Sequence, residues 1–213
     1  METASVESTP RRRGRPPKST ATALDTRAAL LRCGMELLTE KGFHSTGLDE
    51  LLARAGVTKG SFYHCFPSKE VFGLAVIDAY DAYFAGKLDR SLLSTERQPL
   101  DRIADFIADA RAGMVRHHFR RGCLIGNLGQ DSPALPEAYR DRLERVFLDW
   151  QARLARCLEL ARDAGLIADS ANCNELAEFF WIGWEGAVLR SKLMASPRPL
   201  DVFTTAFFSM LPR

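Results

Sequence analysis

Residues 56–70 read GVTKGSFYHCFPSKE, and this segment indicates the architecture of the N-terminal part of the chain. Gly56 ends a short helix expected over residues 47–55, and Thr58 can cap a second short helix that continues to Phe66. A turn of about three to four residues containing Gly between two short helices is typical of a helix-turn-helix. In that motif the second helix presents its first residues to base edges in the major groove of DNA.

The polar side chains of the second short helix are candidate DNA contacts. Its first turn consists of small or basic residues: Thr58, Lys59, Gly60 and Ser61. Such residues allow the backbone to approach phosphate closely. Tyr63 and His64 are expected to point outward and donate hydrogen bonds, and Lys69 can bring a cation and a backbone N–H to one phosphate. Spacing alone also fits an ordinary three-helix bundle with a tight turn.

The residues themselves carry a more specific signal. Residues 56–70 resemble the recognition-helix signature of the TetR family of transcriptional regulators. The lead-in shares the resemblance: residues 28–43, Thr46 and residues 48–55. The whole match covers about residues 26–80. Cys65 stands where the family usually has an aromatic residue or His, and this departure lies late in the helix.

The resemblance implies a helix-turn-helix domain, a divergent C-terminal ligand domain, and a homodimer joined through the last two long helices. It implies a transcriptional repressor whose partners are double-stranded operator DNA and a small-molecule inducer. It also assigns DNA contacts by family pattern to Thr46, Thr58, Lys59, Ser61, Tyr63, His64 and Lys69.

A basic arm precedes the first helix. The net charge is +2, but residues 1–18 hold five cationic side chains against two glutamates, so the rest of the chain is slightly acidic. Residues 1–24 are rich in Ser, Thr, Pro and Arg and are expected to be disordered. Within them residues 12–16, RRGRP, resemble the core of an AT-hook, in which Arg13 and Arg15 lie in a narrow A·T minor groove. The alternative is a nonspecific cationic tail. Either form strengthens DNA binding.

Helical periodicity dominates the remainder, and no useful stretch alternates with a period of two. The expected fold class is therefore all-α, with a helix-turn-helix domain over residues 25–70 and a helical ligand-binding and dimerisation domain over residues 71–213. The first helix is expected over residues 26–41, with Asp25 as its N-cap. Later helices are expected near residues 69–92, 100–117, 136–164, 174–194 and 200–210, with one short helix within residues 120–136.

Composition excludes several other classes. No apolar run approaches the roughly 18 residues of a membrane span, and the polar start lacks the apolar stretch of a secretory signal, so we expect a cytoplasmic protein without a membrane partner. The five cysteines are scattered without a CxxC pair, which argues against disulfides and a structural zinc site. We expect no metal and no cofactor.

A glycine-rich segment, RRGCLIGNLGQD at residues 120–131, is the first candidate ligand site. Each Gly inside a helix costs about 1 kcal/mol relative to Ala, so this density indicates close backbone packing or a cavity. Cys123 follows two arginines, which can lower the pKa of its thiol and make it reactive. The alternative is a small buried thiol. The candidate ligand residues here are Gly122, Cys123, Asn127 and Gln130.

A tryptophan-rich segment, WIGWEGAVLRSK at residues 181–192, is the second candidate. Trp181 and Trp184 with small neighbours fit either a pocket wall or a dimer core. Glu185 needs a partner if it is buried. Arg190 lies five residues later, off the favourable i+4 step, so an intrahelical pair between the two is doubtful.

Together with residues 72–75 and 79–84, these two segments resemble the branch of TetR regulators that respond to acrylate and related reactive small molecules. The resemblance implies a small inducer that is electrophilic or bears a carboxylate. A carboxylate could dock at the backbone N–H groups after Gly122 with help from arginine. In a thiol-based sensor, Cys123 is instead alkylated or oxidised.

A distant alternative is an enzyme that uses Cys123 with a histidine. The sequence contains no nucleophile elbow, metal motif or phosphate loop. We therefore expect a regulator and not an enzyme.

Overall fold

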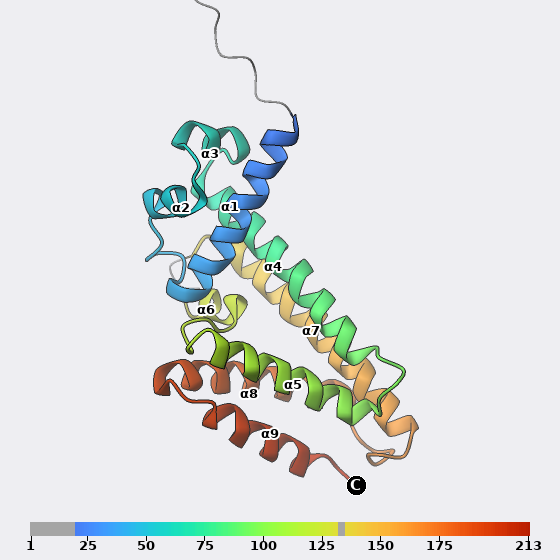
Figure 1. Ribbon diagram of the computed structural model, residues 1–213. Coiled ribbons are helices and arrows are strands. Elements are labelled where there is room, and N and C mark those ends of the chain that lie inside the picture. Colours follow the sequence, from blue (N-terminus) through green and yellow to red (C-terminus); the bar gives the residue numbers. More distant parts are fainter. Residues whose placement is uncertain (1–19, 132–134) are drawn as a thin grey trace, which may run out of the picture.

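The computed structural model describes residues 20–131 and 135–213, and all the regular secondary structure in these residues is helical (Figure 1). The prediction of an all-α fold is confirmed. The helices are α1 (Thr20–Lys41), α2 (Leu48–Ala55), α3 (Lys59–Cys65), α4 (Lys69–Leu92), α5 (Pro99–Arg116), α6 (Leu124–Gln130), α7 (Glu137–Asp163), α8 (Cys173–Met194) and α9 (Arg198–Met210).

Helices α2 and α3 lie against the outer half of α1, at the end of the molecule away from α8 and α9 (Figure 1). Gly56 adopts a left-handed conformation with φ of 64°, which ends α2 and turns the chain into α3. Phe62 and Phe66 on α3 are buried and hold it against the core. Burial of two large aromatic side chains fixes one face of this short helix and leaves the opposite face outward.

The long helices α4 and α7 run side by side and connect the two ends of the molecule (Figure 1). Their shared core is aromatic: Trp150 is fully buried, 4.3 Å from Phe84 and 5.1 Å from Trp181 between ring centroids. Because α1 packs on both α4 and α6, it joins the helix-turn-helix to the larger helical unit. The predicted domain boundary near residue 70 stays a prediction, since α4 contacts elements on both sides of it.

The start of the first helix differs from the prediction. Helix α1 begins at Thr20, so residues 20–24 are helical although they were expected to belong to the disordered arm, and Asp25 lies inside the helix instead of capping it. Alanines at positions 21 and 23 favour this extension, because Ala has the highest helix propensity. The candidate minor-groove residues Arg13 and Arg15 lie outside the described residues.

No helix in the described part of the chain is long and apolar enough to cross a membrane.

Candidate DNA-binding and ligand-binding sites

Helix α3 presents an ordered first turn at the protein surface. The Thr58 hydroxyl oxygen accepts a hydrogen bond from the Ser61 N–H at 3.2 Å, and the two hydroxyl oxygens lie 2.9 Å apart. Thr58 is therefore the N-cap that the sequence predicts. Thr58, Lys59 and Gly60 are exposed, and a methyl group added at Gly60 would meet nothing within 4 Å. The first turn of α3 is therefore open to solvent at Gly60.

Tyr63 and His64 continue the exposed face of α3. The Tyr63 ring is half exposed and stands edge-on to the buried Phe62 ring, with 5.3 Å between centroids. Packing against Phe62 therefore restrains the Tyr63 ring and the direction of its hydroxyl group. The predicted DNA-contact residues on α3 are brought together on one surface that faces away from the larger helical unit.

Thr46 and Lys69 lie beside the connection between α1 and α2, and they differ in exposure. The Thr46 side chain is 2% exposed and its hydroxyl donates to the Gly42 carbonyl oxygen at 2.7 Å. The Lys69 ammonium donates to the Phe43 carbonyl oxygen at 3.2 Å and lies 4.6 Å from the Phe43 ring centre. Burial lowers the pKa of Lys69. Both side chains hydrogen-bond to the α1–α2 connection. The Thr46 hydroxyl is buried there, whereas the half-buried Lys69 ammonium has three donors, so its contact with DNA stays a prediction.

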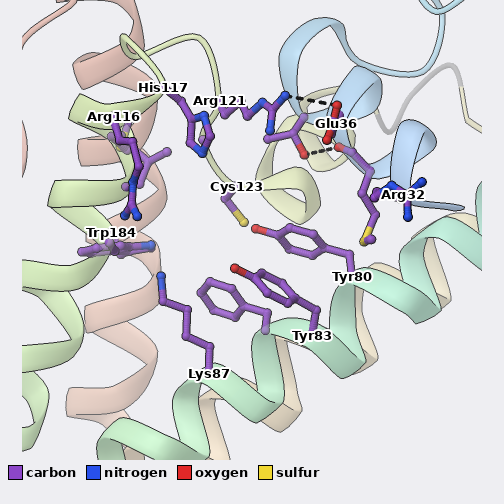
Figure 2. A pocket seen from close by; sticks show the side chains of 18 residues that line it. Arg32, Glu36, Tyr80, Tyr83, Lys87, Arg116, His117, Arg121, Cys123 and Trp184 are labelled. Atoms are coloured by element: carbon purple, nitrogen blue, oxygen red, sulfur yellow. Dashed lines mark hydrogen bonds and ion pairs between the residues drawn. The ribbon is translucent and has the colours of Figure 1, made fainter. Parts of the chain in front are cut away.

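A cavity of about 370 Å³ lies in the C-terminal unit, between α1, α4, α5, α8 and the α5–α6 connection (Figure 2). Its apolar wall includes Tyr80, Phe84, Met114 and Trp184. Its cationic side chains are Arg32, Lys87, Arg116 and Arg121. This combination of an apolar surface with a few polar groups is typical of small-molecule sites.

The cations of the cavity differ in how they are compensated. Arg121 pairs with Glu36 at 3.3 Å and with Glu40 at 2.9 Å, and Lys87 pairs with Asp109 at 2.8 Å. Within the described residues, neither Arg32 nor Arg116 forms a salt bridge. Both residues are exposed, so two unpaired guanidinium groups lie at the rim of the cavity, where they favour an anionic ligand.

Cys123 lies at the start of α6 and lines the cavity. The residue is 5% exposed, and its sulfur accepts a hydrogen bond from the Gly126 N–H at 3.4 Å. Burial and the adjacent Glu185 carboxyl raise the pKa of the thiol well above its usual value. The expectation that two arginines lower this pKa is wrong, because the Arg121 guanidinium turns to carboxylates on α1 and Arg120 is exposed.

A strained turn places Cys123 at the cavity. His118 and Phe119 both have positive φ values, 52° and 56°, a left-handed conformation that is rare for residues with a Cβ atom. The Phe119 N–H donates to the Met114 carbonyl oxygen at 2.8 Å, which closes the end of α5. The chain reverses here and returns along the cavity wall through Arg121 to Cys123.

The predicted ligand residues fall into two groups. Gly122, Cys123 and Trp184 line the cavity. Glu185 does not line it, but its carboxyl contacts Cys123 from behind. A methyl group added at Gly122 would lie 2.9 Å from Val188, so this glycine allows the close approach of α8 that the glycine-rich pattern indicates.

The remaining four residues do not belong to the cavity. Asn127 donates to the Thr39 carbonyl oxygen at 2.6 Å, and Gln130 donates to the Gly126 carbonyl oxygen at 3.4 Å. Trp181 is buried in the aromatic core, and Arg190 is exposed on another face of α8. Gln130 and Trp181 border a separate groove between α6, α7 and α8, and Arg190 borders one between α8 and α9. A ligand role for these four residues stays a prediction.

Sequence reasoning missed the residues that α1, α4 and α5 contribute, among them Arg32, Lys87 and Arg116. Each is a charged residue on a helix. In the sequence, a charged residue at the edge of a cavity has the same pattern around it as an ordinary surface residue. The only sequence signal for this part of the cavity was the resemblance of residues 79–84 to the acrylate-responsive regulators, and that resemblance did not indicate a particular residue. The described residues contain no cluster of metal-ligating side chains.

An exposed helix-turn-helix and a ligand-sized cavity that shares α1 with it define a DNA-binding transcriptional regulator with a ligand-binding domain. The chain belongs to the TetR family. The model of bacterial regulatory proteins of the tetR family matches residues 30–76, and the model of the tetracyclin repressor-like C-terminal domain matches residues 99–207.

Individual relatives agree with this assignment. The chain is 50% identical to the transcriptional regulator AcuR of Cereibacter sphaeroides over 92% of this chain and 89% of the relative. It is 33% identical to the repressor NemR of Escherichia coli K12, over 83% and 89%. Among solved structures, a regulatory protein TetR from Rhodobacter sphaeroides has 49% identity and a TM-score of 0.86, covering 87% of this chain and 98% of that one. The reduced form of E. coli NemR has 32% identity and a TM-score of 0.81, covering 88% and 97%.

Proposed function

We propose that this repressor leaves its operator when a small carboxylic acid or electrophile of the acrylate type enters the cavity beside Cys123. The observation that carries the proposal is the cavity itself, which combines two uncompensated guanidinium groups with a cysteine sulfur. A carboxylate would be held by Arg32 or Arg116. An electrophile would meet the sulfur of Cys123.

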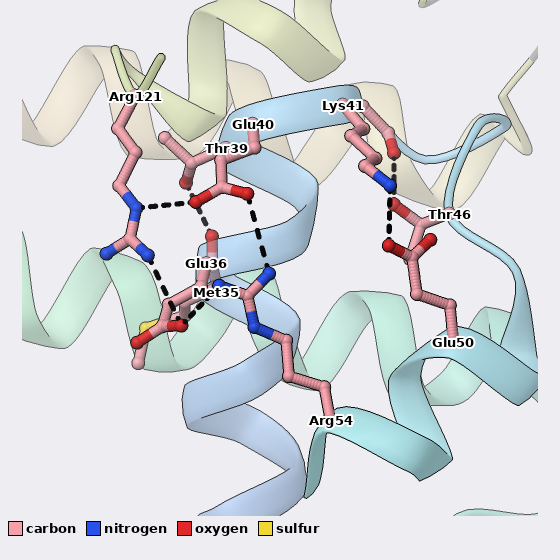
Figure 3. Close-up of polar contacts among 10 residues, drawn as sticks. Met35, Glu36, Thr39, Glu40, Lys41, Thr46, Glu50, Arg54 and Arg121 are labelled. Atoms are coloured by element: carbon pink, nitrogen blue, oxygen red, sulfur yellow. Dashed lines mark hydrogen bonds and ion pairs between the residues drawn. The ribbon is translucent and has the colours of Figure 1, made fainter. Parts of the chain in front are cut away.

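An ion-pair network connects the cavity to the helix-turn-helix (Figure 3). Arg121 on the cavity wall binds Glu36 and Glu40 of α1. Arg54 of α2 binds the same two carboxylates, at 3.1 and 3.4 Å. Although burial opposes the charge of Glu40, the two arginines outweigh it and lower the pKa of this carboxyl. A ligand that displaces Arg121 therefore alters the anchorage of α2.

The ligand must bind one arrangement of the dimer more tightly than the other in order to change DNA affinity. TetR-family regulators dimerise and bind operator DNA. In a two-fold dimer the two recognition helices must fit successive major grooves about 34–36 Å apart. We infer that the ligand-bound arrangement no longer matches this spacing.

We place the homodimer contact on α8 and α9. Both helices carry large apolar side chains that are exposed in the single chain: Phe179, Ile182, Leu189, Leu193 and Val202. Contiguous apolar surface of this kind marks an interaction site. The arrangement puts the two-fold axis at the end of the molecule opposite α3.

For DNA contact we propose the outward residues of α3, with Arg13 and Arg15 as an additional contact from the arm. Thr58 and Ser61 orient the first turn, and Lys59, Tyr63 and His64 supply donors. The Gly60 position permits close approach of the backbone. Thr46 and Lys69 support the fold of the motif from behind.

A thiol-based sensor is the second candidate, because Cys123 lines the same cavity as the cationic side chains. In this version the inducer becomes covalently attached to the sulfur or oxidises it. The enzyme alternative finds no support among the relatives, which carry the names of transcriptional regulators.

The test is fluorescence anisotropy with duplexes from the DNA flanking the gene, at a fixed low salt concentration. We expect tight binding that acrylate reverses and that propionate, the saturated analogue, reverses less well if the sulfur takes part. The Cys123→Ser variant separates the two versions, because release of this variant by acrylate would show reversible recognition. Absence of binding to every duplex at low salt would contradict the proposal.

A further inference from the structure

The carboxyl group of Glu185 is buried next to Cys123. The stem of the side chain borders a groove between α6, α7 and α8, but Oε1 has no exposed surface and no hydrogen-bond partner in the described residues. The Cys123 thiol lies within hydrogen-bonding reach of this carboxyl. A buried carboxyl with one oxygen unpaired is costly, so its position requires a reason beyond packing.

Gly126 provides the space for this carboxyl. A Cβ atom at position 126 would lie 1.7 Å from Oε2 of Glu185 and 2.7 Å from its Cδ. The carboxyl therefore rests directly on the backbone of α6, one helical turn beyond Cys123. No other residue type at this position permits the observed contact.

The sulfur of Cys123 is surrounded by hydrogen-bonding groups. The Gly126 N–H donates to it at 3.4 Å, and the Tyr80 hydroxyl lies within hydrogen-bonding reach from α4 (Figure 2). These donors stabilise negative charge as it develops on sulfur. The Glu185 carboxyl faces the same atom as an acceptor.

Two other charged groups lie near the pair. Lys192 is close enough for its charge to interact with that of Cys123, but within the described residues it forms no salt bridge with Glu185. Lys192 of α8 donates to the Thr39 carbonyl oxygen at 3.2 Å and to the Asn127 side-chain oxygen at 3.4 Å. Glu144 of α7 lines the same groove as Glu185. Because burial raises the pKa of the Cys123 thiol, very little thiolate exists at neutral pH. Reaction of this sulfur therefore requires a local acceptor for its proton.

We propose that Glu185 accepts the thiol proton of Cys123 while the sulfur adds to a small α,β-unsaturated carbonyl compound in the cavity. The C–S bond forms at the β-carbon, and the π electrons move to the carbonyl oxygen as an enolate. Glu185 faces the sulfur from outside the cavity, so the α-carbon takes its proton from water in the cavity. Glu185 then releases its own proton to solvent, which leaves a thioether and a restored carboxylate. Nothing is oxidised and no group leaves. This inference rests on the proposed function and names a residue that acts within it.

The basicity of the Glu185 carboxylate, as well as its position, suits this role. Burial raises its pKa to about 7, so it is a stronger base than a surface carboxylate and is ionised above neutral pH. The rate of addition should therefore rise as the pH passes through about 7.

The test measures alkylation of Cys123 in the full-length protein by acrylamide, followed by intact mass and peptide mapping. Acrylamide is uncharged, so attraction by Arg32 and Arg116 does not enter. We expect Glu185→Gln to slow the reaction at pH 7.5 by about 10- to 100-fold and to remove the inflection near neutral pH. Glu185→Asp should retain part of the rate. Glu144→Gln is the matched control and should react like the unaltered protein.

An unchanged rate and pH profile in Glu185→Gln would overturn the inference. So would a profile of the unaltered protein without an inflection between about pH 6 and 8, a measurement that needs no variant. Alkylation in guanidinium chloride should be equal for all variants. If Cys123 reacts in a Glu185-dependent manner but operator binding persists, the electrophile-release function fails while the proton transfer stands.

Discussion

Glu185 contributes unfavourably to folding once it is ionised. Its pKa is about 7 in the folded protein against an ordinary value of 4.5, so the folded state holds the proton more tightly. Stability from this group is complete below about pH 4.5, declines as pH rises, and is lost above about pH 7.

We therefore compare the free energy of unfolding of Glu185→Gln with that of the unaltered protein at two pH values. The difference between the two proteins should shift in favour of the variant by roughly 3 kcal/mol between pH 5 and pH 8. Urea unfolding of both proteins at one protein concentration measures this difference. An equal difference between the two proteins at both pH values would show that Glu185 does not titrate in this range.

Gly126 and Gly129 offer a matched pair on one short helix. Gly126→Ala forces the Glu185 carboxyl to move and should destabilise the protein by about 1–3 kcal/mol. Gly129 has nothing within 4 Å of an added Cβ, so Gly129→Ala should stabilise it by up to about 1 kcal/mol. Thermal unfolding measures both. Equal effects of the two substitutions would mean that the contact with Glu185 does not restrict position 126.

At the scale of helices, most boundaries could be predicted from local signals. The cap Thr58 and the stop at Gly56 both stand where the sequence places them. The start of α1 was missed because Asp25, a good cap elsewhere, lies within a run that Ala already favours as helix.

The two candidate sites also differ in how far local sequence signals could predict them. The surface of α3 comes from one continuous segment, and its exposure follows from the burial of Phe62 and Phe66. The cavity is assembled from helices far apart in the sequence, so only Gly122, Cys123 and Trp184 among its lining residues could be predicted. Burial and the contact with Glu185 raise the pKa of Cys123, and periodicity does not reveal this contact between two helices.

The ion pairs that join Arg121, in the α5–α6 connection, to α1 and α2 lead to a prediction about coupling. Glu40→Gln removes a carboxylate that both Arg121 and Arg54 contact, so acrylate should change operator affinity about 5- to 10-fold less than in the unaltered protein. Glu50→Gln is the control, because Glu50 pairs with Lys41 outside this network. Anisotropy with and without acrylate gives the ratio. An identical ratio in Glu40→Gln would exclude the network as the connection.

For the whole molecule, the exposed apolar face of α8 and α9 determines whether two recognition helices can act together. Ile182→Glu and Leu193→Glu alter side chains that are 67% and 78% exposed in the single chain, so folding of the subunit should persist. We expect both variants to sediment as monomers and to bind the operator at least about 100-fold more weakly, because a single half-site contact remains. Leu93→Glu, at the end of α4, should remain a dimer. Unchanged sedimentation of the first two variants would place the contact elsewhere.

The turn at His118 and Phe119 has a mechanical consequence. Two successive residues with positive φ hold backbone strain of about 1–3 kcal/mol each, which the surrounding packing must balance. The segment that follows them forms the cavity wall. Strain in this turn therefore lowers the free energy that a ligand must supply to move the cavity wall. Relaxation of the two residues to ordinary φ values would provide part of that free energy, and the long helices would not need to bend.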